Sequence, residues 1–253
     1  MKTLAWLGGI LIVLVAAFYG LNSYIYNEKQ GTMTASNMNI QPISHATFVL
    51  TWDGTVFYND PTGGAEAFAG QPPADIVFVT DIHGDHLSSE TLEAVIGGAT
   101  LVVPQAVKDE LPENLASRAR VLANDETTNE KGFTIRAIPM YNLPESADSR
   151  HTKGRGNGYV IEKNGFRVYI AGDTAGIPEM RSLKDIDIAF APMNLPYTMS
   201  VEEAADAVLD FKPKQVYPYH YRGQDGLADV DRFKELVNAG DPNIEVILAK
   251  WYE

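Results

Sequence analysis

Four potential metal ligands fall within six residues of this chain, in the segment TDIHGDH. They are Asp81, His83, Asp85 and His86, and they lie between the apolar run VFVT and the helix-like segment SSETLEAVIGG. Residues two apart on an extended segment point the same way, so Asp81 and His83 can reach one ion. A turn at Gly84 would direct the other two ligands to a neighbouring position. A single histidine here would usually be a cap or a surface residue, but this density favours a metal site.

Three further residues of the ligand type follow predicted strands or lie in a glycine-rich loop. Asp173 follows the strand in YIAGDT, His220 ends the strand in VYPYHY, and His151 lies in SADSRHTKGRGNGY. Taken singly, Asp173 is explained equally well as a turn residue and His220 as a packed strand residue. The chain has no cysteine, which excludes disulfides, thiolate sites and cysteine nucleophiles, so a metal would need nitrogen and oxygen ligands.

The pattern of apolar residues predicts an α/β chain in which hairpins and βα units are mixed. Asp53-Gly54 and Asn164-Gly165 are strong hairpin turns between strand-like runs. Further strands are expected at 74–80, 99–104, 186–193 and 215–221, and helices at 88–97, 105–110, 201–210 and 229–238.

The N-terminal segment 4–26 is uncharged and predominantly apolar. Its length suffices to cross a hydrocarbon core of about 30 Å as a helix. A cleaved signal sequence is the alternative, but its apolar region is usually about 7–15 residues long and ends at small residues. Phe18, Tyr19 and Leu21 occupy that place here, which favours an uncleaved transmembrane helix.

This reading divides the chain into an anchor or signal sequence at 1–26, a polar tether at 27–40 and a folded domain at 41–253. Lys2 precedes the apolar segment, which weakly favours a cytoplasmic N-terminus. We therefore expect a single-pass protein of the cell membrane whose domain lies outside the cytoplasm. The formal net charge of -13 argues against nucleic acid as a partner, because phosphate binding needs a basic face.

The ordered set DIHGDH, His151, AGDT and PYHY resembles the metallo-β-lactamase superfamily. Within it, the chain most resembles the branch that contains L-ascorbate-6-phosphate lactonase-like and N-acyl-phosphatidylethanolamine phospholipase D-like hydrolases. The segments ISHATFVLTWDGTVFYNDP and PMNLPYTMSVEEAADAV also fit that branch. The resemblance runs from about residue 39 to the end, and it implies an αββα sandwich with metals at one edge.

The resemblance also implies two divalent metal ions and assigns their ligands. Asp81, His83 and His151 fall on the first ion, Asp85, His86 and His220 on the second, and Asp173 bridges them. Asp81 departs from the family motif, which usually has histidine at this position. Zn²⁺ is the first expectation, and the additional carboxylate shifts the preference somewhat toward Mn²⁺ or Fe²⁺. Asp81→His should restore the usual ligand set and change this preference.

The activity implied by the resemblance is hydrolysis of a lactone or of a phosphodiester or other ester bond by a metal-bridging hydroxide. Asp85 would orient the hydroxide or receive its proton, and is the candidate catalytic residue. Other residues could contact the substrate or support the ligands, although solvated charges and packing explain them as well. The candidates for substrate binding are Lys153, Arg155, Arg222 and Tyr197, and those for donating to an oxyanion are Tyr219 and Tyr221. His45 is a candidate for a position behind the ligands.

Two other functions remain in competition. A metal-binding but inactive partner-binding module is suggested only by Asp81. A di-iron redox enzyme is less favoured, because that version of the fold usually has glutamate in its motif, which DIHGDH lacks. For a hydrolase, the substrate would be a small or lipid-derived molecule selected by loops, which metal chemistry alone does not dictate.

Overall fold

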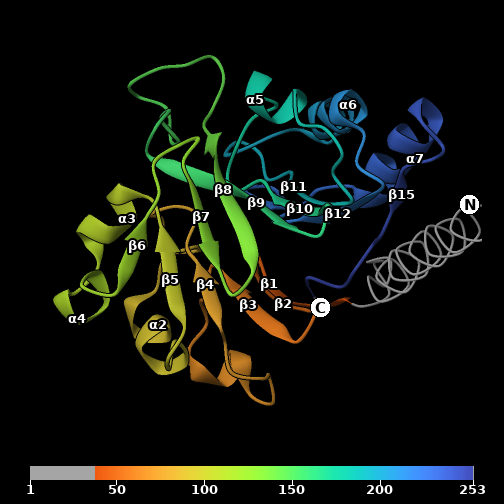
Figure 1. Cartoon of the computed structure of the whole chain (residues 1–253). Helices are drawn as coiled ribbons and strands as arrows, with labels where there is room; N and C mark the ends of the chain where they lie inside the picture. Colours follow the sequence, from red (N-terminus) through yellow and green to blue (C-terminus); the bar gives the residue numbers. More distant parts are fainter. Residues whose placement is uncertain (1–37, 253) are drawn as a thin grey trace, which may run out of the picture. The chain divides into compact units, whose positions relative to one another are not determined.

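Two β-sheets lie face to face in the computed structural model, which describes residues 38–252 (Figure 1). The first sheet begins with antiparallel strands and continues with parallel ones. Its strands, in spatial order, are β1 (Met38–Ser44), β2 (Thr47–Trp52), β3 (Thr55–Asn59), β4 (Ile76–Phe78), β5 (Thr100–Val103) and β6 (Ala119–Val121).

The second sheet is antiparallel at one side and parallel at the other. Its strands, in spatial order, are β15 (Glu245–Val246), β12 (Gln215–Tyr219), β11 (Ile188–Pro192), β10 (Phe166–Ile170), β9 (Gly156–Lys163), β8 (Phe133–Met140) and β7 (Thr127–Glu130). A small separate hairpin joins β13 (Arg222–Gly223) to β14 (Gly226–Leu227).

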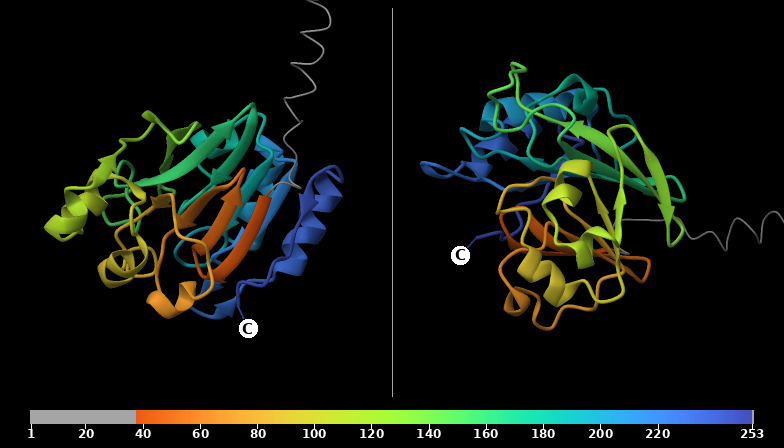
Figure 2. Two further views of the ribbon diagram at one scale, coloured as in Figure 1. Left: turned by 60° about the horizontal axis from the view of Figure 1, so that its bottom comes forward. Right: turned by 90° about the vertical axis from the view of Figure 1, so that its left-hand side faces the viewer.

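Helices cover the outer faces of both sheets (Figure 2). They are η2 (Ala65–Phe68), α2 (Ser89–Val95), α3 (Gln105–Glu110), α4 (Glu113–Ala116), α5 (Pro178–Arg181), α6 (Val201–Phe211) and α7 (Val230–Gly240). Leu92, Val107 and Leu115 from α2, α3 and α4 pack in one apolar cluster with Val77 and Leu101 of the first sheet. The four predicted helices are therefore present, with ends within a few residues of the expected positions.

The space between the sheets is filled by aromatic side chains. Phe48 of β2 stacks on Phe190 of β11 at 4.3 Å between ring centroids, and Phe78 of β4 stacks on Tyr159 of β9 at 4.7 Å. Side chains alternate along a strand, so Val49 of β2 instead faces the helix side. Burial on both faces explains why β4 and β5 are continuous apolar runs.

The two hairpins predicted from the sequence are confirmed. Asp53 and Gly54 join β2 to β3 with φ values of 50° and 74°, and Asn164 and Gly165 join β9 to β10 with 53° and 79°. Positive φ at both central residues is what a two-residue turn of type I′ requires, and Asn-Gly and Asp-Gly supply it at low cost.

The predicted membrane helix is corrected by the structure. No helix among the described residues is long and apolar enough to cross a membrane. The segment 4–26, for which the span was expected, lies outside those residues, as does most of the expected tether 27–40. Strand β1 starts at Met38, inside that expected tether. Residues 38–252 therefore form an α/β sandwich that contains no transmembrane helix, and the single-pass, extracytoplasmic location is withdrawn.

Candidate metal centre

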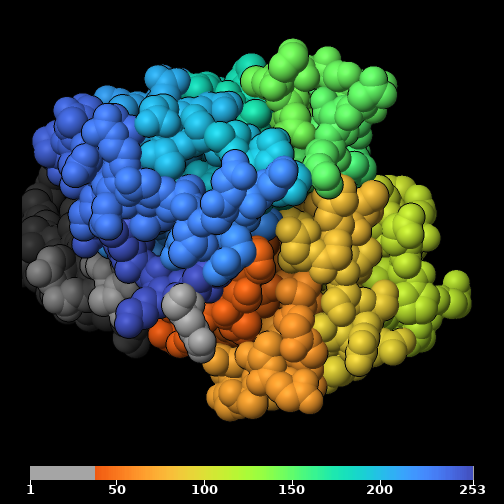
Figure 3. All heavy atoms as spheres, turned by 180° about the vertical axis from the view of Figure 1, so that it is seen from behind, coloured from red at the N-terminus to blue at the C-terminus, as the bar shows by residue number. Residues whose placement is uncertain are grey.

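The predicted ligands lie in loops that leave neighbouring strands at one edge of the sandwich. Residues 81–86 follow β4, Asp173 follows β10, His220 follows β12, and His151 lies in the loop between β8 and β9. Figure 3 shows the segments near residues 85 (yellow-orange), 145–150 (green) and 222–228 (blue) meeting on one face. Segments far apart in the sequence therefore bring their ligand side chains together.

The first group of ligands is Asp81, His83 and His151, whose ligand atoms lie within 4.8 Å of one another. Asp81 Oδ2 lies 2.6 Å from His83 Nδ1 and 3.6 Å from His151 Nε2. Asp81 and His151 are buried, whereas His83 is partly exposed. This is the trio that the resemblance assigns to the first ion.

The second group of ligands is Asp85, His86 and His220. His220 Nε2 lies 3.2 Å from His86 Nε2 and 3.3 Å from Asp85 Oδ2. Asp173 lies between the two groups: its Oδ2 is 3.3 Å from both His86 Nε2 and His151 Nε2, and its Oδ1 is 3.4 Å from His220 Nε2. The carboxylate of Asp173 thus faces both groups, as a bridging ligand would.

The electrostatics of these side chains favour bound cations. Burial alone would raise the pKa of Asp173, but His220 and His86 hold it well below its usual range. Burial would likewise lower the pKa of His86, but Asp173 and Asp60 raise it well above its ordinary value. Among residues 38–252, seven buried side-chain atoms have no hydrogen-bond partner, and three of them belong to the ligand groups: His151 Nδ1, His151 Nε2 and Asp173 Oδ1. Such atoms are rare unless a ligand satisfies them, so this donor set fits divalent ions.

Asp60, at the end of β3, supports the second group from behind, and the sequence reading missed it. Its Oδ2 lies 2.9 Å from His86 Nδ1, and Thr80 donates to both of its carboxylate oxygens at 2.7 Å. A proton on Nδ1 shared with Asp60 leaves His86 Nε2 free to face an ion. The sequence signal was the polar pair Asn59-Asp60 directly after an apolar strand.

We expect Asp60→Asn to weaken metal binding by the second group by roughly 10- to 100-fold, the usual effect of losing a carboxylate behind a histidine ligand. The amide replaces one acceptor oxygen by an NH₂ donor, so it cannot accept from Thr80 N, Thr80 Oγ1 and His86 Nδ1 together as the carboxylate does, and the His86 ring loses its fixed orientation. Titration against a chelator of known affinity measures the change. An affinity equal to that of the unmodified protein would show that packing alone orients His86.

Arg155 binds the carboxylate of Asp81. Its Nε donates to Asp81 Oδ1 at 3.1 Å and its Nη2 to Oδ2 at 3.0 Å. The sequence suggested Arg155 as a substrate contact, but the structure places it against a predicted metal ligand. Burial would raise the pKa of Asp81, and hydrogen bonding to His83 together with the charges of His86, His83 and Arg155 lowers it instead.

A cavity of about 440 Å³ opens over the two ligand groups. Of the candidate substrate contacts, Tyr197 and Arg222 line it. His45, which was expected behind the ligands, lines it too, as does Arg150, which was not predicted from the sequence. Arg150 lies 4.6 Å from the Tyr197 ring centroid, and Arg222 lies 4.7 Å from that of Tyr252. These stacks hold two cations at the entrance to the cluster.

Lys153, Tyr219 and Tyr221 do not line this cavity. Lys153 pairs with Glu179 at 2.9 Å and lies over the Tyr141 ring, beside a different hollow. Tyr219 is fully buried and its hydroxyl accepts from Gly172 N at 2.9 Å, while Tyr221 packs against Tyr252. His45 packs edge-on against His220, with 5.4 Å between ring centroids.

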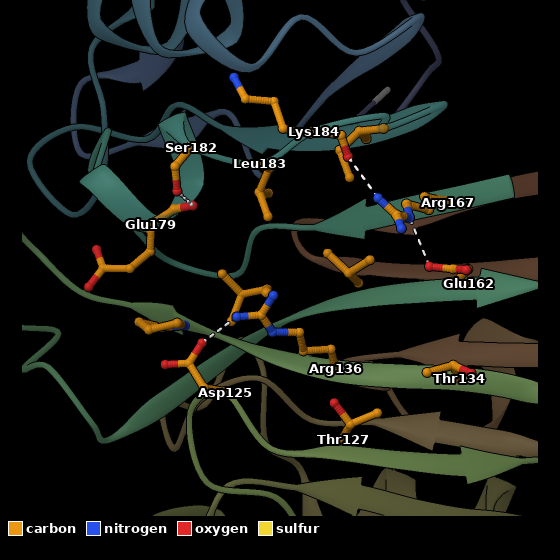
Figure 4. Close-up of a pocket in the computed structure, with 14 residues that line it drawn as sticks. Asp125, Thr127, Thr134, Arg136, Glu162, Arg167, Glu179, Ser182, Leu183 and Lys184 are labelled. Atoms are coloured by element: carbon orange, nitrogen blue, oxygen red, sulfur yellow. Dashed lines mark hydrogen bonds and ion pairs between the residues drawn. The ribbon is translucent and has the colours of Figure 1, made fainter. Parts of the chain in front are cut away.

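A second cavity, of about 420 Å³, lies against the outer face of the second sheet, on β7 to β10. Figure 4 shows Arg136 beside Asp125 and Arg167 beside Glu162, with N···O distances of 2.7 and 2.8 Å. These charges neutralise one another, and this groove lies outside the metal cluster.

Comparison with known proteins identifies relatives of this chain. A family model described as a beta-lactamase superfamily domain matches residues 39–220. The UPF0173 metal-dependent hydrolase of Thermococcus onnurineus is 32% identical over 221 residues, covering 84% of this chain and 96% of that protein.

Solved structures give the same result for the fold. A protein from Parabacteroides distasonis described as a metal-dependent hydrolase superposes with a TM-score of 0.74 at 37% identity, covering 85% of this chain and 94% of that one. The diiron β-hydroxylase CmlA from Streptomyces venezuelae shares the fold at 20% identity and a TM-score of 0.63, covering 84% of this chain and 53% of that one.

Proposed function

Because the chain belongs to the UPF0173 family of the metallo-β-lactamase superfamily, we propose that it is a binuclear metal-dependent hydrolase. The observation that carries this proposal is the position of Asp173, whose two carboxylate oxygens face histidines of both ligand groups at 3.3 to 3.4 Å. The first group would hold one ion, the second group the other, and Asp173 both. Zn²⁺ is the preferred ion, with Mn²⁺ or Fe²⁺ as alternatives suited to the carboxylates.

When bound, such a pair of ions lowers the pKa of a water between them and polarises the bond under attack. Asp85 is the residue of the cluster best placed to handle the proton, because its side chain is 44% exposed and lines the cavity. Burial would raise the pKa of Asp85, but His220 and His86 hold it below its usual range. The carboxylate is therefore ionised at neutral pH and can accept a proton at Oδ1 or Oδ2.

The substrate proposed is a small or lipid-derived lactone, phosphodiester or other ester. The cavity volume of about 440 Å³ suits a small molecule or the reactive end of a larger one. Arg222 and Arg150 could hold its carboxylate or phosphate, and the Tyr197 hydroxyl could donate to it. The resemblance to lactonase-like and phospholipase D-like hydrolases supports the same bond types.

A metal-binding but inactive partner-binding module is the second candidate. It is favoured by one observation, the engagement of Asp81 by Arg155, which draws a predicted ligand toward a guanidinium. The likeness to CmlA concerns the fold alone and adds nothing in favour of redox chemistry.

The test is metal analysis of the purified chain, followed by turnover of lactone, phosphodiester and β-lactam substrates with Zn²⁺ and Mn²⁺ compared side by side. We expect two ions per chain and turnover that falls by roughly 10²-fold or more in Asp85→Asn, as for loss of a general base. Asp148→Asn, an exposed change in the loop that carries His151, is the matched control and should behave as the unmodified chain. Full metal loading without turnover of any substrate class would favour the inactive module, and iron with a visible absorption band would favour redox chemistry.

A further inference from the structure

The two ligand groups contain the same kinds of donor but differ in the charged residues behind them: Asp60 contacts His86 of the second group, and Arg155 contacts Asp81 of the first. Each group has two histidines and one terminal aspartate, Asp81 in the first and Asp85 in the second, and Asp173 faces both groups. Arg155 accompanies only the first group. Among residues 38–252, no lysine or arginine forms an ion pair with Asp85, whose carboxylate pairs with His86 and His220.

Arg155 holds Asp81 in a way that leaves one oxygen facing the ligands. The guanidinium makes two hydrogen bonds, one to each carboxylate oxygen, which is the fork geometry that fixes a carboxylate most firmly. Asp81 Oδ2 also lies 2.6 Å from His83 Nδ1. The side chain of Asp81 is fully buried and that of Arg155 only 20% exposed, so solvent screens this charge pair weakly.

The pair changes the charge that an incoming ion meets. In the first group the positive charge of Arg155 cancels the negative charge of Asp81, which leaves only the shared Asp173 to attract a cation. In the second group no lysine or arginine of the described residues neutralises the negative charge of Asp85. The same guanidinium would also repel a divalent ion bound at Asp81 Oδ2, because Nη2 lies 3.0 Å from that oxygen.

We propose that Arg155 makes the two metal sites unequal, so that the second group fills first and the first group binds its ion more weakly. This rests on the proposed two-metal function and concerns its regulation: the chain would pass between one-ion and two-ion states as the supply of divalent metal changes. Arg155 is thus a positioning and charge-setting residue of the first site, not a substrate contact.

The proposal predicts an order of affinities set by charge. In Zn²⁺ titrations against a competing chelator, the full chain should bind two ions in separate steps. Arg155→Met should tighten the weaker step at least tenfold, because the negative charge of Asp81 is then no longer neutralised. Asp81→His should weaken that step at least tenfold, because Arg155 loses its partner. The double variant Asp81→His with Arg155→Met should return close to the unmodified chain, because both charges are gone.

Control variants distinguish an effect of charge on metal affinity from an effect on folding. Arg136→Met breaks another Arg–Asp pair, with Asp125, in the groove on the outer face of the second sheet (Figure 4), and should leave both binding steps unchanged. Arg155→Lys keeps the positive charge but not the two parallel hydrogen bonds, and the weaker binding step should keep its low affinity. Thermal unfolding in the presence of chelator reports whether each variant folds. If Arg155→Met does not fold, Asp81→His and the double variant still test the order.

A purely orienting role for Arg155 gives the opposite result. In that case Arg155→Met would lower the affinity of the weaker binding step below that of the unmodified chain. The double variant would not recover the affinity lost in Asp81→His. Either finding overturns the proposal, as would two equal binding steps in the unmodified chain. An unmodified chain that binds no divalent ion would instead overturn the proposed function itself, so the two failures are distinguishable.

Discussion

Asp173→Asn is expected to release metal from both ligand groups at once and to lower turnover by roughly 10³-fold or more, the scale of losing a main electrostatic element of a site. Asp173 is buried, and its two oxygens face His86, His151 and His220 at 3.3 to 3.4 Å. The amide has almost the same shape but carries no charge and only one acceptor oxygen. Metal content per chain after dialysis and initial rates on the best substrate measure the two effects.

The control for this change is Asp187→Asn, which also neutralises a buried aspartate. Asp187 pairs with Lys214 at 2.7 Å and accepts from Arg167 N at 2.8 Å, with no contact to the ligand groups. It should lower stability without altering metal content. If Asp173→Asn kept one ion per chain at full affinity, Asp173 would belong to a single site and the bridging arrangement would be wrong.

The parts of the site that the sequence predicted are those with local signals. The segment from Asp81 to His86 carries four ligand types directly after a buried strand, and Ser88 caps the helix that follows by accepting from Thr91 N. Asp173 and His220 each follow an apolar strand. Because neighbouring strands end at a common edge, such residues come together once the sheets form.

The residues that were missed or given another role depend on contacts between distant segments. Asp60 lies 26 residues before His86, and Arg155 lies 74 residues after Asp81. Nothing in the sequence around either residue specifies its partner. The same limit explains Lys153, which the sequence suggested as a substrate contact but which forms an ion pair with Glu179 of α5. Arg155 also changes the prediction for Asp81→His. Restoring the usual ligand set would now require Arg155→Met in the same chain, because the guanidinium would otherwise lack its carboxylate partner.

The largest effect on folding is expected from Gly172→Ala. Gly172 has φ +67°, which alanine adopts at a cost of about 1–2 kcal/mol. A Cβ at this position would also lie 2.5 Å from Met140 Sδ and 3.3 Å from Asn157 O. Met140 is fully buried, so it has little room to move away. Overpacking of this kind costs about 1–3 kcal/mol, and we expect the two penalties to add to roughly 2–5 kcal/mol.

Gly165→Ala isolates the backbone part of this loss. Gly165 has φ +79° in the β9–β10 turn, with nothing within 4 Å of a Cβ there, so its variant should lose only the backbone penalty. Urea unfolding of both variants in chelator gives the difference, and Met140→Ala in the Gly172→Ala background should recover part of it. Equal losses for the two glycine variants would mean that the Met140 contact relaxes freely. Because Asp173 follows Gly172 directly, the strain reaches the metal centre, and we expect Gly172→Ala to lose metal affinity while Gly165→Ala keeps it.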